Sequence, residues 1–449
     1  MTDARIDPSP HESSADLYRV VAVLVVVVGH WLLAAVTFHG GRFGYDEVLA
    51  ELPWTQWLTW LFQVVPVFFV VAGYANAASW TRRHAAARPL RDWLRHRVAG
   101  IVGPTTAYVA VPVVAVAVAG WLGIDGSRLA MPMWVVALHL WFLPVYLGVV
   151  SLTPVAVAAQ QRWGLKVPAA FVVAVAAVDA LTLGLHVPAL GWINYALCWG
   201  AIYQFGVAWH GGALAGRRAL TLAAGSAVVL ATVIPLNLYP VSMIGVAGQT
   251  IQNTSPPTVA LLALAGVQAG LLLAAAPTVT AWLQRVRWRH VLVVANENAM
   301  ALYLWHMVPV VVVALVCYPS GTVPQPALGT GAWWLWRLVW VAVLSVVTAT
   351  ELYLLWLGRA AFARPVPAVR VGLPIGCSQP VLVVGGAAVA YSLWQLAANG
   401  FAPGGHLPVA VVAIYLAGVV LVSLNPIGAS RHGREFDAVP ATPSKGGSS

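Results

Sequence analysis

Charged side chains are scarce in this sequence, since only 8% of its 449 residues are Asp, Glu, Lys or Arg. A soluble domain has about 25%, so this chain cannot cover a water-facing surface. Cysteine is also scarce, and the three cysteines lie far apart in apolar runs, without the spacing of a disulfide framework or a zinc site. These shortages exclude a nucleic-acid-binding basic domain, a disulfide scaffold, a disordered chain and a coiled coil.

Long apolar runs are what the sequence has instead, and hydrophobic residues make up 60% of it. A helix needs about 20 apolar residues to cross a bilayer, and such runs recur between short loops without the alternation of a membrane β-barrel. We therefore predict an all-α polytopic membrane protein of about twelve transmembrane helices. Their expected ranges are 17–37, 56–80, 98–121, 132–152, 168–186, 192–210, 219–239, 258–280, 291–317, 333–358, 380–399 and 406–424.

The basic residues fall on one side of these predicted helices. Counting the loops alternately, 21 of the 24 Lys and Arg residues lie on the side that also holds both termini. Cytoplasmic loops retain positive charge, so we expect a multi-pass protein of the plasma membrane with both termini in the cytoplasm. The most basic loop, 81–97, suits topology setting and attraction to anionic headgroups, or docking of a phosphorylated substrate such as a coenzyme.

Ionisable residues inside the predicted helices are few, and burying each in a bilayer is costly. His30 follows Arg19 by eleven residues, almost three helical turns, so the two lie on one face about 16 Å apart. Depth along the helices places Asp179 in the layer of His30, with His139 slightly farther out. Glu297 and Glu351 lie nearer the cytoplasm. For any single membrane histidine, a structural role as a neutral hydrogen-bonding imidazole is the simpler interpretation.

Four segments resemble the acyltransferase family 3 proteins, integral membrane enzymes that O-acylate carbohydrates, lipids and natural products. The first helix has an acid, an Arg three residues later and a histidine eleven residues after that. The other three segments resemble the family's Phe-Phe-x-x-Ser-Gly-Phe, Leu-Trp-Phe-Leu and Ser-x-x-x-Tyr-x-x-His patterns. The matching residues are Asp16, Arg19 and His30; Phe68, Phe69, Gly73 and Tyr74; His139, Trp141, Phe142 and Leu143; and Asn298, Tyr303 and His306.

The sequence also departs from the family pattern. Ala72 and Tyr74 replace the usual Ser and Phe, Gly100 stands where another Arg is frequent, and Ala363 opens a segment where a Glu-Arg-Pro ending is common. The family core resembles about ten helices. The resemblance therefore implies an acyltransferase-like core at 16–360, followed by a cytoplasmic loop with two additional helices at 361–426. The charge asymmetry predicts that the tail at 1–15 is cytoplasmic, and the Gly-, Ser- and Pro-rich composition of 427–449 predicts a disordered cytoplasmic tail.

The resemblance implies transfer of an acyl group from cytoplasmic acyl-CoA to a hydroxyl, with no bound cofactor and no metal. His30 suits the catalytic base, because the pKa of histidine is near neutral, or it carries the acyl group itself. Arg19, with Arg95 and Arg97, would hold the donor phosphates. Either Asp179 or Glu351 could orient the imidazole. The remaining candidates for substrate binding are Asp16, Tyr74, His139, Trp141, Tyr303 and His306.

A proton-coupled transporter or exporter is the alternative from another class. In that case His30, Asp179, Glu297 and Glu351 would form a proton relay. No internal repeat of the kind common in transporters is evident in the sequence. A third interpretation, a catalytically silent membrane partner, holds only if His30 can be replaced without effect.

Overall fold

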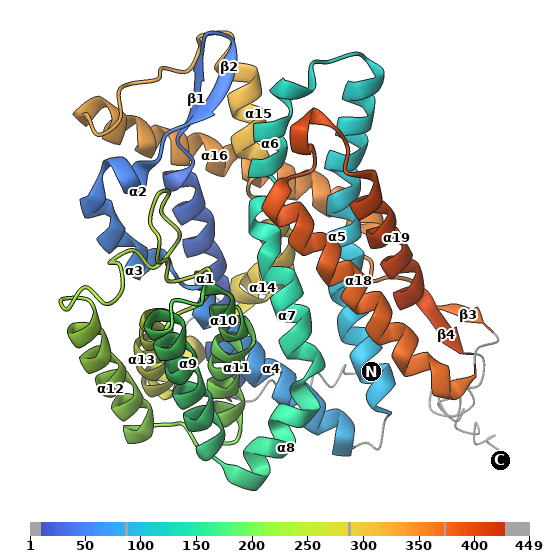
Figure 1. Ribbon diagram of the computed structural model, residues 1–449. Helices are drawn as coiled ribbons and strands as arrows, with labels where there is room; N and C mark the ends of the chain where they lie inside the picture. Colours follow the sequence, from blue (N-terminus) through green and yellow to red (C-terminus); the bar gives the residue numbers. More distant parts are fainter. Residues whose placement is uncertain (1–9, 86–88, 286–288, 372–373, 427–449) are drawn as a thin grey trace, which may run out of the picture.

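The computed structural model describes residues 10–85, 89–285, 289–371 and 374–426 as a helical bundle with two small sheets (Figure 1). The predicted C-terminal tail, 427–449, lies outside the described residues. The longest helices are α1 (Pro10–Leu33), α4 (Val65–Ala85), α5 (Leu90–Trp121), α9 (Lys166–Gly184), α11 (Ile193–His210), α13 (Val259–Arg285), α16 (Gly331–Leu357) and α18 (Ser378–Asn399).

Shorter elements join these helices. The remaining α-helices are α2 (Val48–Glu51), α3 (Thr59–Phe62), α6 (Ala130–Val135), α7 (Phe142–Ser151), α8 (Thr153–Trp163), α10 (Pro188–Gly191), α12 (Arg217–Val233), α14 (Arg289–Trp305), α15 (Val308–Cys317), α17 (Arg359–Phe362) and α19 (Val409–Ser423). The 3-10 turns are η1 (Pro53–Leu58), η2 (Gly126–Arg128), η3 (Leu138–Trp141), η4 (Ile375–Cys377) and η5 (Pro403–Gly405). Strands β1 (Val36–His39) and β2 (Arg42–Tyr45) pair antiparallel, and β3 (Val369–Val371) and β4 (Leu424–Pro426) pair parallel.

The all-α prediction is confirmed, and each of the twelve expected ranges contains a helix in the described chain. Eight helices there are long and apolar enough to cross a membrane, or nine if the bent pair α14–α15 is one span. The other expected spans correspond to α11, α12 and α19, which are not among these nine. The protein is therefore a multi-pass membrane protein, and a total of twelve spans stays a prediction.

Three expected spans are interrupted rather than continuous: the range 56–80, where η1 and α3 precede α4, and two others. The range 291–317 is divided into α14 and α15, which meet at an angle of 50°. Pro309 explains the break, because proline has no N–H to donate to the carbonyl of Trp305, four residues earlier, and its ring clashes with that carbonyl at the end of α14. The range 132–152 contains α6, the 3-10 turn η3 and α7. These last two interruptions lie at mid-span, and both carry a histidine, His139 in η3 and His306 just after α14.

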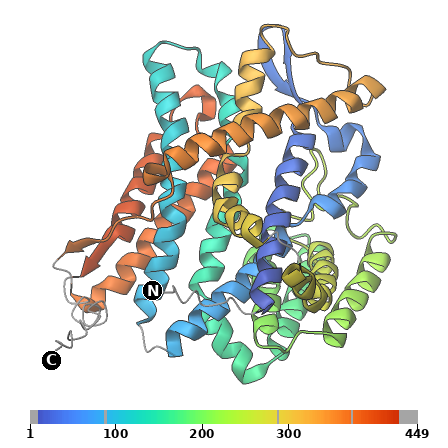
Figure 2. The ribbon, with the colours of Figure 1, turned by 180° about the vertical axis from the view of Figure 1, so that it is seen from behind.

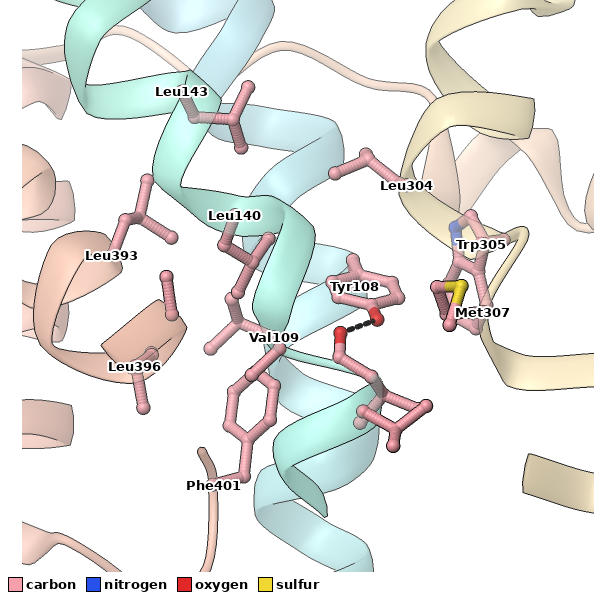
Figure 3. Close-up of a cluster of buried hydrophobic side chains, with 14 of the residues drawn as sticks. Tyr108, Val109, Leu140, Leu143, Leu304, Trp305, Met307, Leu393, Leu396 and Phe401 are labelled. Carbon is pink, nitrogen blue, oxygen red and sulfur yellow. Dashed lines mark hydrogen bonds between the residues drawn. The ribbon is translucent and has the colours of Figure 1, made fainter. Parts of the chain in front are cut away.

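The C-terminal helices α18 and α19 belong to the main hydrophobic core. Leu393, Leu396 and Tyr415 are 1% exposed and share a cluster with Leu140 and Leu143. Figure 3 shows part of this cluster, together with the hydrogen bond from the Tyr108 hydroxyl to a backbone carbonyl, that of residue 136. Seen from behind, α16 crosses the bundle obliquely (Figure 2). The two additional helices are therefore part of the same fold as the core that precedes them.

Candidate active site

A cavity of about 890 Å³ lies inside the bundle. Its polar lining is graded along α1, which starts at the end of the molecule where Arg82, Arg83, Arg91 and Arg95 lie, hereafter the basic end. No Asp, Glu or Lys is found among the described residues that line it. Toward the basic end it is lined by Arg19, His96, Arg97 and Asn296; midway by His30, His139 and Tyr303; and at the opposite end by Trp134, Trp192, Tyr195 and Trp394.

Two side-chain contacts join α1 to α14 across one wall of this cavity. Arg19 donates from Nη1 to Oδ1 of Asn296 at 3.0 Å. Nδ1 of His30 lies 2.8 Å from Nε2 of His306. The two helices run in the same direction, so these contacts are separated by eleven residues on one helix and ten on the other. The sequence-based expectation that Arg19 and His30 face the same side is confirmed, since both line the cavity.

The backbone fixes the hydrogen-bonding roles of the two paired histidines. Nδ1 of His306 lies 2.7 Å from the carbonyl oxygen of Tyr303. A carbonyl can only accept, so in a neutral imidazole this Nδ1 carries the hydrogen and Nε2 of His306 keeps its lone pair. His30 must then donate from Nδ1 to that lone pair. The Nε2 atom of His30 is thereby left unprotonated, which is the state that a base or a nucleophile requires.

The break between α14 and α15 holds His306 in this position. Trp31, the neighbour of His30, donates from its indole N–H to the backbone carbonyl of His306 at 2.8 Å. His306 is fully buried, and its ring is nearly coplanar with that of His30, with an interplanar angle of 16° and centroids 5.1 Å apart, as their N–H···N hydrogen bond requires. Adjacent residues of α1 therefore bind both the side chain and the backbone of His306. The pair is fixed more rigidly than a single hydrogen bond would allow.

His139 is the third histidine of this cluster. Its ring is 2% exposed and lies 4.9 Å from the ring of His306, edge to face. Tyr303 holds the turn that carries it, because the tyrosine hydroxyl donates to the carbonyl of His139 at 2.6 Å. Both ring nitrogens of His139 are shielded from solvent, and the backbone of Leu304 offers a hydrogen-bond acceptor to the ring. A third, buried imidazole therefore lies beside the His30–His306 pair.

The two arginines expected to hold the donor have different surroundings. Arg97 lines the cavity near Arg19, and its guanidinium lies 5.8 Å from the ring of Trp93. Arg95 does not line it; this residue donates to the carbonyls of Pro367 at 3.1 Å and Ser423 at 3.4 Å. The structure therefore brings Arg97, but not Arg95, to Arg19. Arg95 instead ties the C-terminal helix pair to α5.

Five other sequence candidates do not line the cavity: Asp16, Tyr74, Asp179, Glu351 and His306. Asp179 accepts hydrogen bonds from Asn194 at 2.7 Å, the hydroxyl of Tyr239 at 2.9 Å and the backbone N–H of Val259 at 2.7 Å. Its carboxylate is therefore bound to these three groups and not to His30. Glu351, on α16, has a buried carboxylate oxygen with no hydrogen-bond partner in the described chain. Asp16 lies one turn before Arg19.

Tyr74 packs between two helices and does not line the cavity. Its ring lies 4.2 Å from that of Trp209, where α4 crosses α11. The preceding Gly73 permits this crossing, since a Cβ there would collide with the carbonyl oxygen of Tyr203. Trp141, by contrast, lines the cavity as expected. Tyr74 therefore stabilises the contact between two helices.

Sequence reasoning missed Asn296 and the aromatic residues at the end of the cavity opposite the arginines. Asn296 could have been found, because an asparagine in an apolar span is costly and it precedes His306 by nearly the same interval that separates Arg19 from His30. Trp192, Tyr195 and Trp394 gave no such signal. Their meeting depends on how α18 packs, which no local pattern encodes.

Comparison with known proteins identifies the family. No curated protein and no solved structure matches the chain. A family model described as an acyltransferase domain matches residues 12–356, which is most of the chain and includes Arg19, His30, His139, Tyr303 and His306. This confirms the resemblance seen in the sequence motifs. The chain therefore belongs to the acyltransferase 3 family and is a membrane acyltransferase.

Proposed function

We propose that the protein transfers an acyl group from acyl-CoA, entering from the cytoplasm, to a hydroxyl group of a carbohydrate, lipid or natural product. The observation that supports this most is the His30–His306–Tyr303 chain of hydrogen bonds, which leaves Nε2 of His30 unprotonated in the cavity. The protein would lie in the plasma membrane, with the basic end facing the cytoplasm. Acyl-CoA is a substrate here, so the proposal includes no resident cofactor.

The ends of the cavity suit the two parts of the donor. Arg19 and Arg97 line the basic end, and the lining described there has no carboxylate to neutralise them. Guanidinium groups bind phosphate oxygens through charge-assisted hydrogen bonds. With the donor phosphates at these arginines, the pantetheine arm would extend along α1 toward His30. The separation of about 16 Å between Arg19 and His30 would place the thioester away from the charged end.

The reaction needs one base and one oxyanion donor. Nε2 of His30 takes the proton of the acceptor hydroxyl. At the same time the hydroxyl oxygen attacks the thioester carbonyl carbon, and a C–O bond forms. The carbonyl becomes a tetrahedral oxyanion, which a ring N–H of His139 would stabilise once the substrate is bound, since His139 lines the same cavity as His30. The C–S bond then breaks, and the proton on His30 passes to the departing thiolate. The products are the acylated acceptor and free CoA.

The same lone pair also suits His30 as an acyl carrier. In that route Nε2 attacks the thioester, the C–S bond breaks and CoA leaves as a thiolate, so that an acyl imidazolium remains. The acceptor hydroxyl then attacks the acyl carbon, the C–N bond breaks to restore neutral His30, and the proton of the hydroxyl balances the CoA thiolate. The two routes differ in whether the protein becomes labelled by the donor before acceptor is added. Radiolabelled acyl-CoA mixed with enzyme alone, followed by rapid acid quenching, distinguishes them.

The proton-coupled transporter receives less support from the structure. A relay needs its titratable groups to lie near one another, yet Asp179 is held by Asn194 and Tyr239, and Glu297 is exposed on α14. In the described lining of the cavity, histidines occur without carboxylates. We therefore retain the acyltransferase as the proposed function.

The test is the substitution His30→Gln in the full-length protein. Glutamine keeps a polar side chain of similar reach but cannot act as a base, so transfer should fall by about 10²–10⁴-fold. Binding of acyl-CoA should persist, because Arg19 and Arg97 lie at the basic end of the cavity, away from residue 30. His406→Gln, at an exposed position outside the cavity, is the matched control. A His30→Gln enzyme that binds donor and turns over within a few-fold of the parent would refute the mechanism.

A further inference from the structure

The end of the cavity opposite the arginines has an uncharged, aromatic lining. Trp192 and Tyr195 from the start of α11 stack with centroids 5.4 Å apart, and Trp134 from α6 lines the same region. The hydroxyl-bearing residues Thr254 and Ser255 also line the cavity there. This end therefore offers flat apolar faces and neutral hydrogen-bonding groups, and the described part of its lining has no charged side chain.

Trp394 on α18 completes this aromatic lining. Its ring lies 5.2 Å from Tyr195 and 6.1 Å from Trp192, nearly perpendicular to both. The helix that carries it follows the segment matched by the family model, which ends at residue 356. A residue from outside the family segment therefore forms part of the cavity wall.

The packing of α18 fixes where Trp394 points. The preceding Leu393 and, two positions after Trp394, Leu396 are each 1% exposed within the main core. At the end of the helix, Gly400 has a φ of +78°, and a Cβ there would lie 2.9 Å from the Cα of Trp134. The next residue, Phe401, donates from its backbone N–H to the carbonyl of Met133 at 3.3 Å. The helix is thus held on both sides of Trp394, so the indole is a preorganised part of the wall.

We propose that this end of the cavity is the acceptor subsite, that its ligand is an uncharged, hydroxylated ring compound with an apolar face, and that Trp394 is a specificity-determining residue. The inference rests on the proposed function. It assigns the C-terminal helices a role in choosing the acceptor, while the family segment performs the transfer.

The chemistry of the lining selects for neutral rings. The apolar face of a hydroxylated ring gains dispersion energy and buried area on an aromatic surface. Its hydroxyls can bond to side chains such as those of Thr254 and Ser255. A carboxylate or phosphate at the same place would lose its water without gaining a counter-charge, and that loss is costly. The donor cannot exchange places with the acceptor for the same reason, since its phosphates need the arginines.

The experiment compares two matched probes with acetyl-CoA as donor. Methyl β-glucopyranoside is neutral, and methyl β-glucuronide differs from it by a carboxylate. We expect transfer to the neutral probe to exceed transfer to the charged one by at least tenfold. Trp394→Ala should raise the KM for the neutral probe about 5- to 10-fold, given the usual energy of an aromatic contact. The KM for acetyl-CoA should not change, and Trp394→Phe should restore most of the affinity.

Tyr391→Ala is the control, because Tyr391 is 51% exposed on the same helix, outside the cavity. It should leave both KM values unchanged. Equal use of the two probes, or equal effects of Trp394→Ala and Tyr391→Ala, would overturn the proposal. So would His30-dependent hydrolysis of acetyl-CoA without transfer to either probe, although the proposed function would survive. Acetyl-CoA consumption that does not depend on His30 would instead contradict the proposed function.

Discussion

Replacing His306 by leucine removes the acceptor that holds the Nδ1–H of His30. Leucine is apolar and of similar length, so the cavity wall would keep much of its shape. The backbone carbonyl of residue 306 would still accept from Trp31, since that bond at 2.8 Å does not involve the imidazole. The substitution therefore isolates the hydrogen bond at 2.8 Å between the two imidazoles.

The size of the effect follows from the cost of an unpaired buried donor, about 1–3 kcal/mol. Without its acceptor, the productive form of His30 is disfavoured by this amount relative to the form with hydrogen on Nε2. At 1.4 kcal/mol per factor of ten, the fraction of productive enzyme falls about 5- to 150-fold. We expect kcat to fall by that factor. The KM for acyl-CoA should change little, because Arg19 and Arg97 are untouched.

His306→Gln is the informative companion. The side-chain oxygen of glutamine reaches close to the position of Nε2 and can accept from His30, so activity should exceed that of His306→Leu by at least several-fold. The assay is release of CoA thiol with acyl-CoA and acceptor, normalised to folded protein. Equal losses in the two variants would refute the tautomer argument. Activity of His306→Leu within two-fold of the parent would show that the pair has no role in the reaction.

Three further predictions concern orientation, donor binding and a buried acid. Cysteines placed at Ser127 and Ala215, in a chain whose exposed Cys377 is replaced, should react with an impermeant thiol reagent from opposite sides of the membrane; labelling from the same side would contradict the topology. Arg97→Gln should raise the KM for acyl-CoA about tenfold or more, since hydrogen bonds between charged groups contribute about 1.5–3 kcal/mol. Arg95→Gln should lower thermal stability and leave that KM unchanged, and a raised KM would place it at the donor. Asp179→Asn should destabilise the fold by about 1–3 kcal/mol, measured by melting in detergent, with unchanged kcat per folded molecule; a lost kcat would place this acid in the chemistry.

The sequence was sufficient to predict the helices and to place Arg19 and His30 on the same face of one helix. Apolar runs of membrane length have few alternatives to a helix, because every backbone polar group in the bilayer must be paired. The interval between two residues on one helix fixes both their separation and their relative direction. These two facts are local, and a single chain segment contains all the information they need.

Asp179 shows where the same reasoning ends. Its expected depth matches that of His30, but depth is only one of three coordinates, and the direction of a side chain around its helix depends on neighbours that the sequence does not name. Its three hydrogen bonds hold Asn194, Tyr239 and Val259 instead. The breaks at η3 and after α14 are also hard to foresee. Pro309 marks one of them, yet only the packed structure shows that the break brings His306 to His30.

The parallel course of α1 and α14 fixes the distance between Arg19 and His30. Arg19 contacts Asn296 and His30 contacts His306, so the two segments are joined at both ends of the stretch from residue 19 to residue 30. A helix is too stiff to change the length of that stretch. Donors would then be sorted by length: a truncated thioester could reach the histidine but not the arginine. One inserted residue in α1 would turn His30 by about 100° away from its partner. An insertion or a deletion between Arg19 and His30 would therefore break one of the two contacts between α1 and the α14 segment.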